Sequence, residues 1–121
     1  MSKPILCLDF DGVIHSYSSG WKGADVIPDA PVPGAIDFIR SALDHFDVQI
    51  YSSRSSQLGG INAMQDYILA HTDTDCRLVE AIGWPDAKPA AFITIDDRAL
   101  TFDGTWPAID YLKNFKPWNK K

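Results

Sequence analysis

The chain has 121 residues, of which 45% are hydrophobic and 22% charged, an ordinary composition for a single soluble globular domain. Its net charge of -5 excludes a general electrostatic attraction to nucleic acid or anionic membranes, but not a local basic pocket. The chain shows no signal-peptide pattern, and no segment approaches the ~20 apolar residues of a membrane span. Cys7 and Cys76 lie in apolar runs without metal-ligand spacing, which predicts buried free thiols in a reducing, cytoplasmic environment.

The predicted elements alternate between strands and helices along the chain. An apolar run predicts a first strand at residues 5–10. The segment at about 13–33 is rich in Gly, Ser and Pro, and we expect it to form a small ordered flap, such as a hairpin. The remaining predicted elements are a helix at 34–46, a strand at 48–51, a helix at 61–70, strands at 76–82, 90–95 and 99–102, and a closing helix at 107–115.

Strands separated by helices predict βαβ units, and therefore an α/β domain with a mostly parallel sheet that spans residues 1–121. In such sheets, ligands bind beyond the carboxyl ends of the strands. Asp9, Ser52 and Asp96 each stand at the end of a predicted strand. We therefore expect these three side chains to face one common site.

Asp9 and Asp11 are the most informative residues of the chain. Side chains two positions apart in a strand share a face, so the two carboxylates can converge on one point. Like charges this close raise each other's pKa and favour a bound cation or a shared proton. The pair therefore predicts a functional site and argues against two solvated surface charges.

The polar groups at the predicted strand ends suit phosphoryl chemistry. A carboxylate can attack phosphorus as a nucleophile, and a divalent cation such as Mg²⁺ can screen the two anions from each other. Lys88 and Ser52 can hold phosphate oxygens, while a second carboxyl group carries the proton. Asp96 and Asp97 add the clustered carboxylate oxygens that Mg²⁺ prefers.

These residues and their order resemble the four short motifs of the haloacid dehalogenase superfamily of phosphotransferases. The match extends over most of the predicted core, and its first and fourth motifs are the more specific ones. In chain order, the matching segments are Asp9-Phe10-Asp11-Gly12-Val13, Ile50-Tyr51-Ser52, Lys88 within Asp86-Ala87-Lys88-Pro89, and Ile93-Thr94-Ile95-Asp96-Asp97.

The resemblance implies a Rossmann-like three-layer sandwich and a role for each matched residue. Asp9 would be the nucleophile and Asp11 the general acid and base, and Asp11 favours a phosphatase because the dehalogenase branch lacks it. Ser52 and Lys88 would bind phosphate. The implied Mg²⁺ ligands are Asp9, the backbone carbonyl of Asp11, Asp96, and Asp97 directly or through water.

Many members of this superfamily carry a large cap domain between these motifs. Here the first gap holds only the flap and one predicted helix, and the second holds one predicted helix and one predicted strand, so the chain resembles a capless member. A capless member tends to have an open site, or one closed by another subunit. The expected substrate is a phosphate monoester, such as a nucleotide, a nucleic-acid end or another phosphometabolite. The sequence does not choose between a monomer and a homo-oligomer.

Several assignments stay open at the level of sequence. Arg54 follows Ser52 and Ser53, and it either binds a distal part of the substrate or pairs with an acid; Ser53 is an alternative to Ser52. The flap side chains either contact substrate or pack on the domain; they are His15, Tyr17, Trp21 and Lys22. The alternative function is a non-catalytic module that recognises phosphorylated partners.

Overall fold

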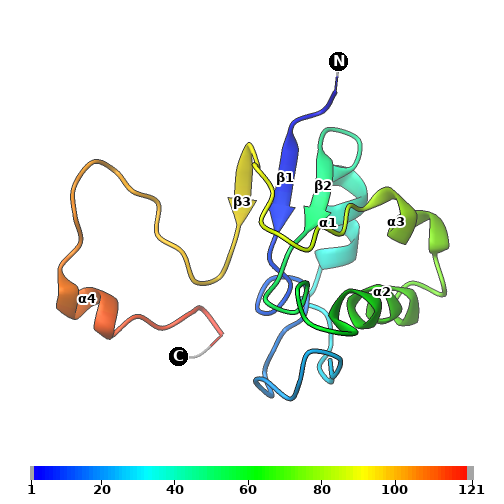
Figure 1. Cartoon of the computed structure of the whole chain (residues 1–121), viewed down its shortest axis with the longest axis horizontal. Coiled ribbons are helices and arrows are strands. Elements are labelled where there is room, and N and C mark those ends of the chain that lie inside the picture. The colour runs from blue at the N-terminus through cyan, green and yellow to red at the C-terminus, as the bar shows by residue number, and fades with distance from the viewer. Residues whose placement is uncertain (1, 120–121) are drawn as a thin grey trace.

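The computed structural model describes residues 2–119 and shows an α/β fold built on a small open parallel sheet (Figure 1). The strand order is β2-β1-β3, with β1 at Ile5–Leu8, β2 at Asp47–Ile50 and β3 at Ile93–Ile95. Leu8 pairs with Ile50 on one side and with Ile95 on the other. The carboxyl ends of all three strands therefore meet at one edge, as expected from the βαβ pattern.

Within residues 2–119, four helices accompany the sheet: α1 at Ala35–Ala42, α2 at Gly60–Ala70, α3 at Cys76–Ala81 and α4 at Ile109–Lys113. The predicted helices at 34–46, 61–70 and 107–115 are confirmed in type, as are the strands at 5–10, 48–51 and 90–95, with shifted or shorter bounds. None of the described helices is long and apolar enough to cross a membrane.

The predicted strand at 76–82 is wrong, because this segment forms α3. The side chain of Asp75 accepts a hydrogen bond from the backbone N–H of Leu78 at 3.1 Å and so caps the helix. Leu78 is buried within α3, whereas Cys76 is exposed, which corrects the expectation that both cysteines are buried; Cys7 is buried as expected. The segment at 99–102 forms no strand either and lies exposed.

One apolar core joins the sheet to α1 and α2. The central strand contributes Leu6 and Leu8, and β2 contributes Val48 and Ile50. Their spacing of two places each pair on one face of the sheet. Side chains from the two helices and from the residue after Asp9 complete this core; they include Ile39, Ala42, Met64, Ile68 and Phe10. This packing fixes the edge of the sheet at which the predicted site residues lie.

The flap at 13–33 is an ordered loop whose two ends are joined by antiparallel backbone contacts. The backbone N–H of Ser16 donates to the carbonyl of Ala30 at 3.0 Å, and that of Val32 donates to Ile14 at 2.8 Å. The Tyr67 hydroxyl in α2 donates to the carbonyl of Asp29 at 2.8 Å, which ties the flap to the core. The flap is thus hairpin-like at its base and lies next to the loop that carries Asp11.

The chain beyond Asp97 leaves the rest of the molecule. Figure 1 shows residues 98–117 running away from the sheet, with α4 at the far end of the excursion. We call residues 98–117 the arm and residues 2–97 the body. The expected closing helix exists, but it does not close the body, because Ile109 stays 70% exposed and α4 has no buried residue.

Candidate active site

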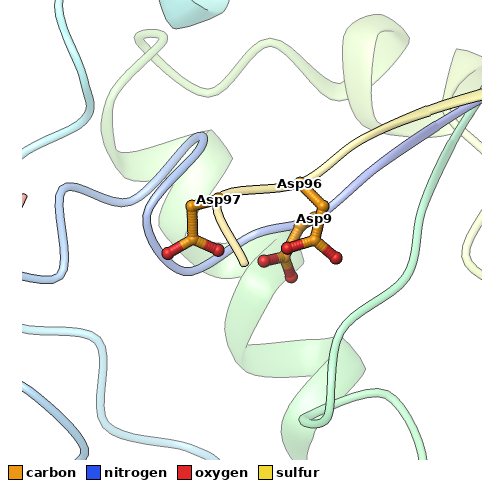
Figure 2. A group of neighbouring side chains, drawn as sticks. All are labelled: Asp9, Asp96 and Asp97. Carbon is orange, nitrogen blue, oxygen red and sulfur yellow. The ribbon is translucent and has the colours of Figure 1, made fainter. Parts of the chain in front are cut away.

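Three carboxylates meet where β1 and β3 end (Figure 2). Asp9 directly follows β1, and its backbone N–H donates to the carbonyl of Ile95 at 3.0 Å. Asp96 and Asp97 directly follow β3. One carboxylate oxygen from each of Asp9, Asp96 and Asp97 lies within 4.8 Å of the others. The parallel pairing of two neighbouring strands therefore brings the first and fourth motifs together.

The electrostatics of this cluster favour a bound proton or a cation. Burial, a hydrogen bond with Asp97 and the charge of Asp96 raise the pKa of Asp9 to about 8. Burial also raises the pKa of Asp97, whose side chain is 3% exposed. Because three negative charges cannot share this space cheaply, a divalent cation would relieve their repulsion as a proton does. Carboxylate oxygens are the ligands that Mg²⁺ prefers.

A cavity of about 170 Å³ opens beside the cluster and unites residues from all four motifs. Asp9 and Asp96 line it together with Ser52 and the exposed Lys88. Several water volumes of ~30 Å³ fit in this space, so it has room for a phosphoryl group. The other lining residues are Cys7, Tyr51, Ser53 and Thr94, so both serines of the pair reach the cavity.

Ser52 is held by the turn that follows β2. Its Oγ accepts a hydrogen bond from the backbone N–H of Arg54 at 3.2 Å, and its own backbone N–H donates to Ser55 Oγ at 3.0 Å. Only 3% of Ser52 is exposed. The turn therefore fixes the hydroxyl at the cavity wall.

The side chain of Asp11 lies outside both the carboxylate cluster and the cavity lining. Its oxygens contact Nδ1 of His15 at 2.9 Å and Nε of Arg54 at 3.0 and 3.2 Å. Burial opposes the charge of this carboxyl, but the contacts with His15 and Arg54 outweigh it and lower the pKa of Asp11. The described arrangement thus holds Asp11 as a carboxylate.

Arg54 is fully buried, and of its two possible roles the structure shows pairing with an acid. Its Nη1 donates to the carbonyls of Gly23, Ala24 and Val26 in the flap at 2.8, 2.9 and 3.2 Å. The guanidinium carbon lies 4.7 Å from the centre of the Trp21 ring. Its Nη2 is buried and has no hydrogen-bond partner among the described residues. Arg54 therefore joins the flap to Asp11.

His15 and Gly12 have roles that the sequence reading did not identify. His15 is fully buried, and its Nε2 accepts a hydrogen bond from the backbone N–H of Asp29 at 3.1 Å. Its position four residues after Asp11 is the one sequence signal for this contact. Gly12 has a φ of 81°, and a Cβ at this position would collide with the carboxylate of Asp97. The glycine thus lets the loop pass beside the fourth motif.

The remaining flap residues differ in their surroundings. Trp21 is 44% exposed and lies over Arg54, so it packs on the domain while keeping an open face. Lys22 is exposed, whereas Tyr17 is half-buried with a φ of 61°. None of these three lines the cavity beside Asp9.

A scan against protein-family models and searches of curated proteins and of solved structures found no match to this chain. The class that the described residues define is an α/β protein with an acidic cluster and a polar cavity at the carboxyl edge of a parallel sheet.

Proposed function

We propose that the protein is a Mg²⁺-dependent phosphohydrolase similar to the haloacid dehalogenase superfamily, acting through an aspartyl-phosphate. One observation carries the proposal: four residues from separate parts of the chain line a single cavity of about 170 Å³. They are Asp9, Ser52, Lys88 and Asp96. Each has the chemistry that the matching motif requires, and chance assembly of all four around one cavity is improbable.

The donor set fits a hard divalent cation. Asp9, Asp96 and Asp97 offer only carboxylate oxygens within 4.8 Å of one another, and the raised pKa of Asp9 reflects its burial, its hydrogen bond with Asp97 and the charge of Asp96. These three residues would hold Mg²⁺, with the backbone carbonyl of Asp11 as the further ligand that the resemblance implies. When bound, the ion neutralises charge on the phosphoryl oxygens.

The residues support a two-step transfer. An oxygen of Asp9 attacks phosphorus, the ester P–O bond breaks, and protonated Asp11 gives its proton to the leaving oxygen. Water then attacks the phosphorus, Asp11 takes its proton, and the bond to Asp9 breaks to release phosphate. Ser52 and Lys88 hold phosphate oxygens in both steps. The contacts of Asp11 with Arg54 and His15 favour the carboxylate, which is the form needed in the second step.

The finer description of the fold belongs to the same proposal. We assign the domain to a capless, Rossmann-like three-layer sandwich with a small flap after the first strand. A parallel bridge between Gln49 and Gly83 supports this assignment, because it extends the sheet beyond β2. The open approach suits a phosphate monoester such as a nucleotide, a nucleic-acid end or another phosphometabolite.

A second function is favoured by one observation. Because the Asp11 carboxylate contacts Arg54 and His15 and does not line the cavity, the site has its phosphate-binding groups without a free proton carrier. A module that binds phosphorylated partners without turnover would need no more than this.

The deciding experiment is a phosphate-release screen with Mg²⁺. The panel contains an aryl phosphate, nucleotides, and oligonucleotides phosphorylated at the 3′ or 5′ end. We expect turnover by the wild type and a loss on the order of 10³-fold or more in Asp9→Asn. Asp44→Asn is the matched control, since Asp44 is exposed and does not line the cavity. Circular dichroism checks that both variants fold.

Three results would separate the candidates. A phosphoenzyme that accumulates in Asp11→Asn supports the covalent route. Normal turnover in Asp9→Asn rules out Asp9 as the nucleophile. Binding of panel members with no turnover of any of them favours the recognition module.

A further inference from the structure

We propose that the arm is a dimerisation element, and that residues 98–117 of each copy pack against the body of a second copy. The resulting pair is closed by a two-fold axis, so each copy gives one arm and receives one. This inference rests on the exposed apolar side chains and the charges of the protein, and it is independent of the proposed phosphatase activity.

The arm presents a concentrated apolar surface. Trp106 is 86% exposed and Ile109 70%, and the rings of Phe102 and Trp106 lie 4.7 Å apart. Side chains of the arm surround a hollow of about 540 Å³ that no described part of the body fills. The large exposed apolar residues of the arm are Leu100, Phe102, Trp106, Ile109, Tyr111, Leu112 and Phe115. Five of these residues line the same hollow, and apolar patches of this kind on soluble proteins commonly mark interaction sites.

The body carries an apolar surface that matches the arm. β3 is an edge strand of the sheet, with Ile93 51% and Ile95 39% exposed on one face. Phe38 of α1 is 47% exposed and lines a groove of about 230 Å³ together with Leu8, Ile95 and other apolar residues. An apolar groove beside an unpaired strand edge is a favourable place for a second chain to dock.

Both ends of the arm are held by its own body, and this argues for a second copy as the partner. The arm directly follows Asp97 of the body, whose side chain is 3% exposed in the carboxylate cluster. It ends where Trp118 Nε1 donates to the carbonyl of Gly12 at 2.7 Å and Asn119 Nδ2 donates to Ser16 at 2.9 Å. The middle of the arm is thus projected away from the body rather than left as a free tail (Figure 1).

The charges of the arm side and the body are opposite. Residues 1–97 contain 14 acidic and six basic residues, a net charge of -8, whereas the arm contains two acidic and three basic residues, a net charge of +1. A basic segment is therefore attracted to an acidic body. Since every copy carries both surfaces, the complement of the arm is available on the same protein.

The exposed area is sufficient for a stable pair. Aromatic side chains bury about 150–250 Å² each when fully covered. Four of the seven arm residues are aromatic and the other three are smaller aliphatic residues, so at their observed exposures the seven expose on the order of 700 Å². If each arm buries half of this area, about 350 Å², and covers an equal area of the other body, the two arms and the two body surfaces together bury about 1,400 Å². Specific, stable interfaces bury about 1,200–2,000 Å² in total.

The test is the oligomeric state of the full chain, measured by sedimentation velocity over a wide concentration range. We expect a dimer whose dissociation constant rises at least about 100-fold in Trp106→Asp and in Phe38→Asp, since buried anchor residues dominate such interfaces. Leu58→Asp is the matched control, because Leu58 is fully exposed but lies in the loop before α2, in neither surface. Circular dichroism establishes that the three variants keep the fold.

Two outcomes would overturn the proposal. One is a wild type that stays monomeric at every concentration, which includes the case of an arm folded onto its own body. The other is a dimer that both Trp106→Asp and Phe38→Asp leave intact. Neither outcome bears on Asp9, so the phosphatase proposal would be unaffected.

Discussion

Nε of Arg54 donates to both carboxylate oxygens of Asp11, at 3.2 and 3.0 Å. The two residues are 43 positions apart, one after β1 and the other after β2. Because the same guanidinium also donates to three flap carbonyls, the position of Asp11 depends on the flap being in place. Asp11, the proton carrier of the proposed reaction, and the flap are thus held in position by the same side chain, Arg54.

Replacing Arg54 by Met should destabilise the protein by about 3–5 kcal/mol, because it removes one of the two partners of the largely buried Asp11 carboxylate and leaves only His15. Arg40→Met is the matched control: Arg40 also pairs with an aspartate, Asp75, at 3.2 Å, but its side chain is 46% exposed. Such exposed pairs contribute about 0–1 kcal/mol. Denaturant unfolding of both variants measures the difference, and equal losses would contradict a structural role for the buried pair.

Gly12→Ala should disturb the site beyond its effect on the backbone. A positive φ costs a non-glycine residue about 1–2 kcal/mol, and here the added Cβ also collides with the Asp97 carboxylate. Gly20→Ala isolates the first cost, since Gly20 has a φ of 75° and nothing lies within 4 Å of its added Cβ. We expect the free energy of unfolding of Gly12→Ala to fall by ~1–3 kcal/mol more than that of Gly20→Ala, because of overpacking. We also expect Mg²⁺ to stabilise Gly12→Ala less than it stabilises the wild type. Identical unfolding curves for the two variants would refute the contact.

The sequence predicts the strand ends of this protein well, for a physical reason. Buried strands need apolar runs, and Asp9, Ser52 and Asp96 interrupt such runs abruptly, so the ends of the strands are visible in the sequence. Parallel pairing then brings these ends to one edge without further information. The cavity beside Asp9 contains all three, together with Lys88.

The sequence does not reveal which local cap decides between a helix and a strand, or which distant segments come into contact. A local cap at Asp75 makes 76–81 a helix, although Leu78 and Val79 also suit a strand. The buried pairing of Arg54 with Asp11 needs the flap to fold over both. The apolar period of 107–115 predicts a helix, but amphipathicity does not tell whether the covering surface belongs to the same copy or to another.

The stability of the metal-free protein should depend on the ionisation of Asp9. Folding raises the pKa of Asp9 from 3.8 to about 8, so the folded state favours the protonated form. This contribution is fully present below pH 3.8 and is lost as the pH rises through about 8. We expect Asp9→Asn, measured by thermal unfolding in EDTA, to gain stability relative to wild type between about pH 4 and 8.

Two comparisons make the pH experiment specific. Asp44→Asn should run parallel to wild type, because Asp44 is exposed. The pKa of Asp11 is lowered, so its contribution is present above the ordinary aspartate pKa and is lost only as the pH falls through its own lower value. The window above pH 4 therefore reports on the acidic cluster, and parallel curves for Asp9→Asn and wild type would show that Asp9 stays ionised without metal.

Mg²⁺ should stabilise the folded protein through the same carboxylates. A ligand that binds only the folded state adds about 2.7 kcal/mol at a concentration of 100 times its Kd. Asp96→Asn keeps an oxygen that can accept the 2.9 Å hydrogen bond from the backbone N–H of Arg98, so its effect should fall on the metal. We expect the Mg²⁺-induced rise in Tm to shrink in Asp9→Asn and Asp96→Asn and to persist in Asp44→Asn. The measurement needs no substrate. An equal Mg²⁺-induced rise in Tm in the wild type and all three variants would show that the cation does not bind at the carboxylate cluster.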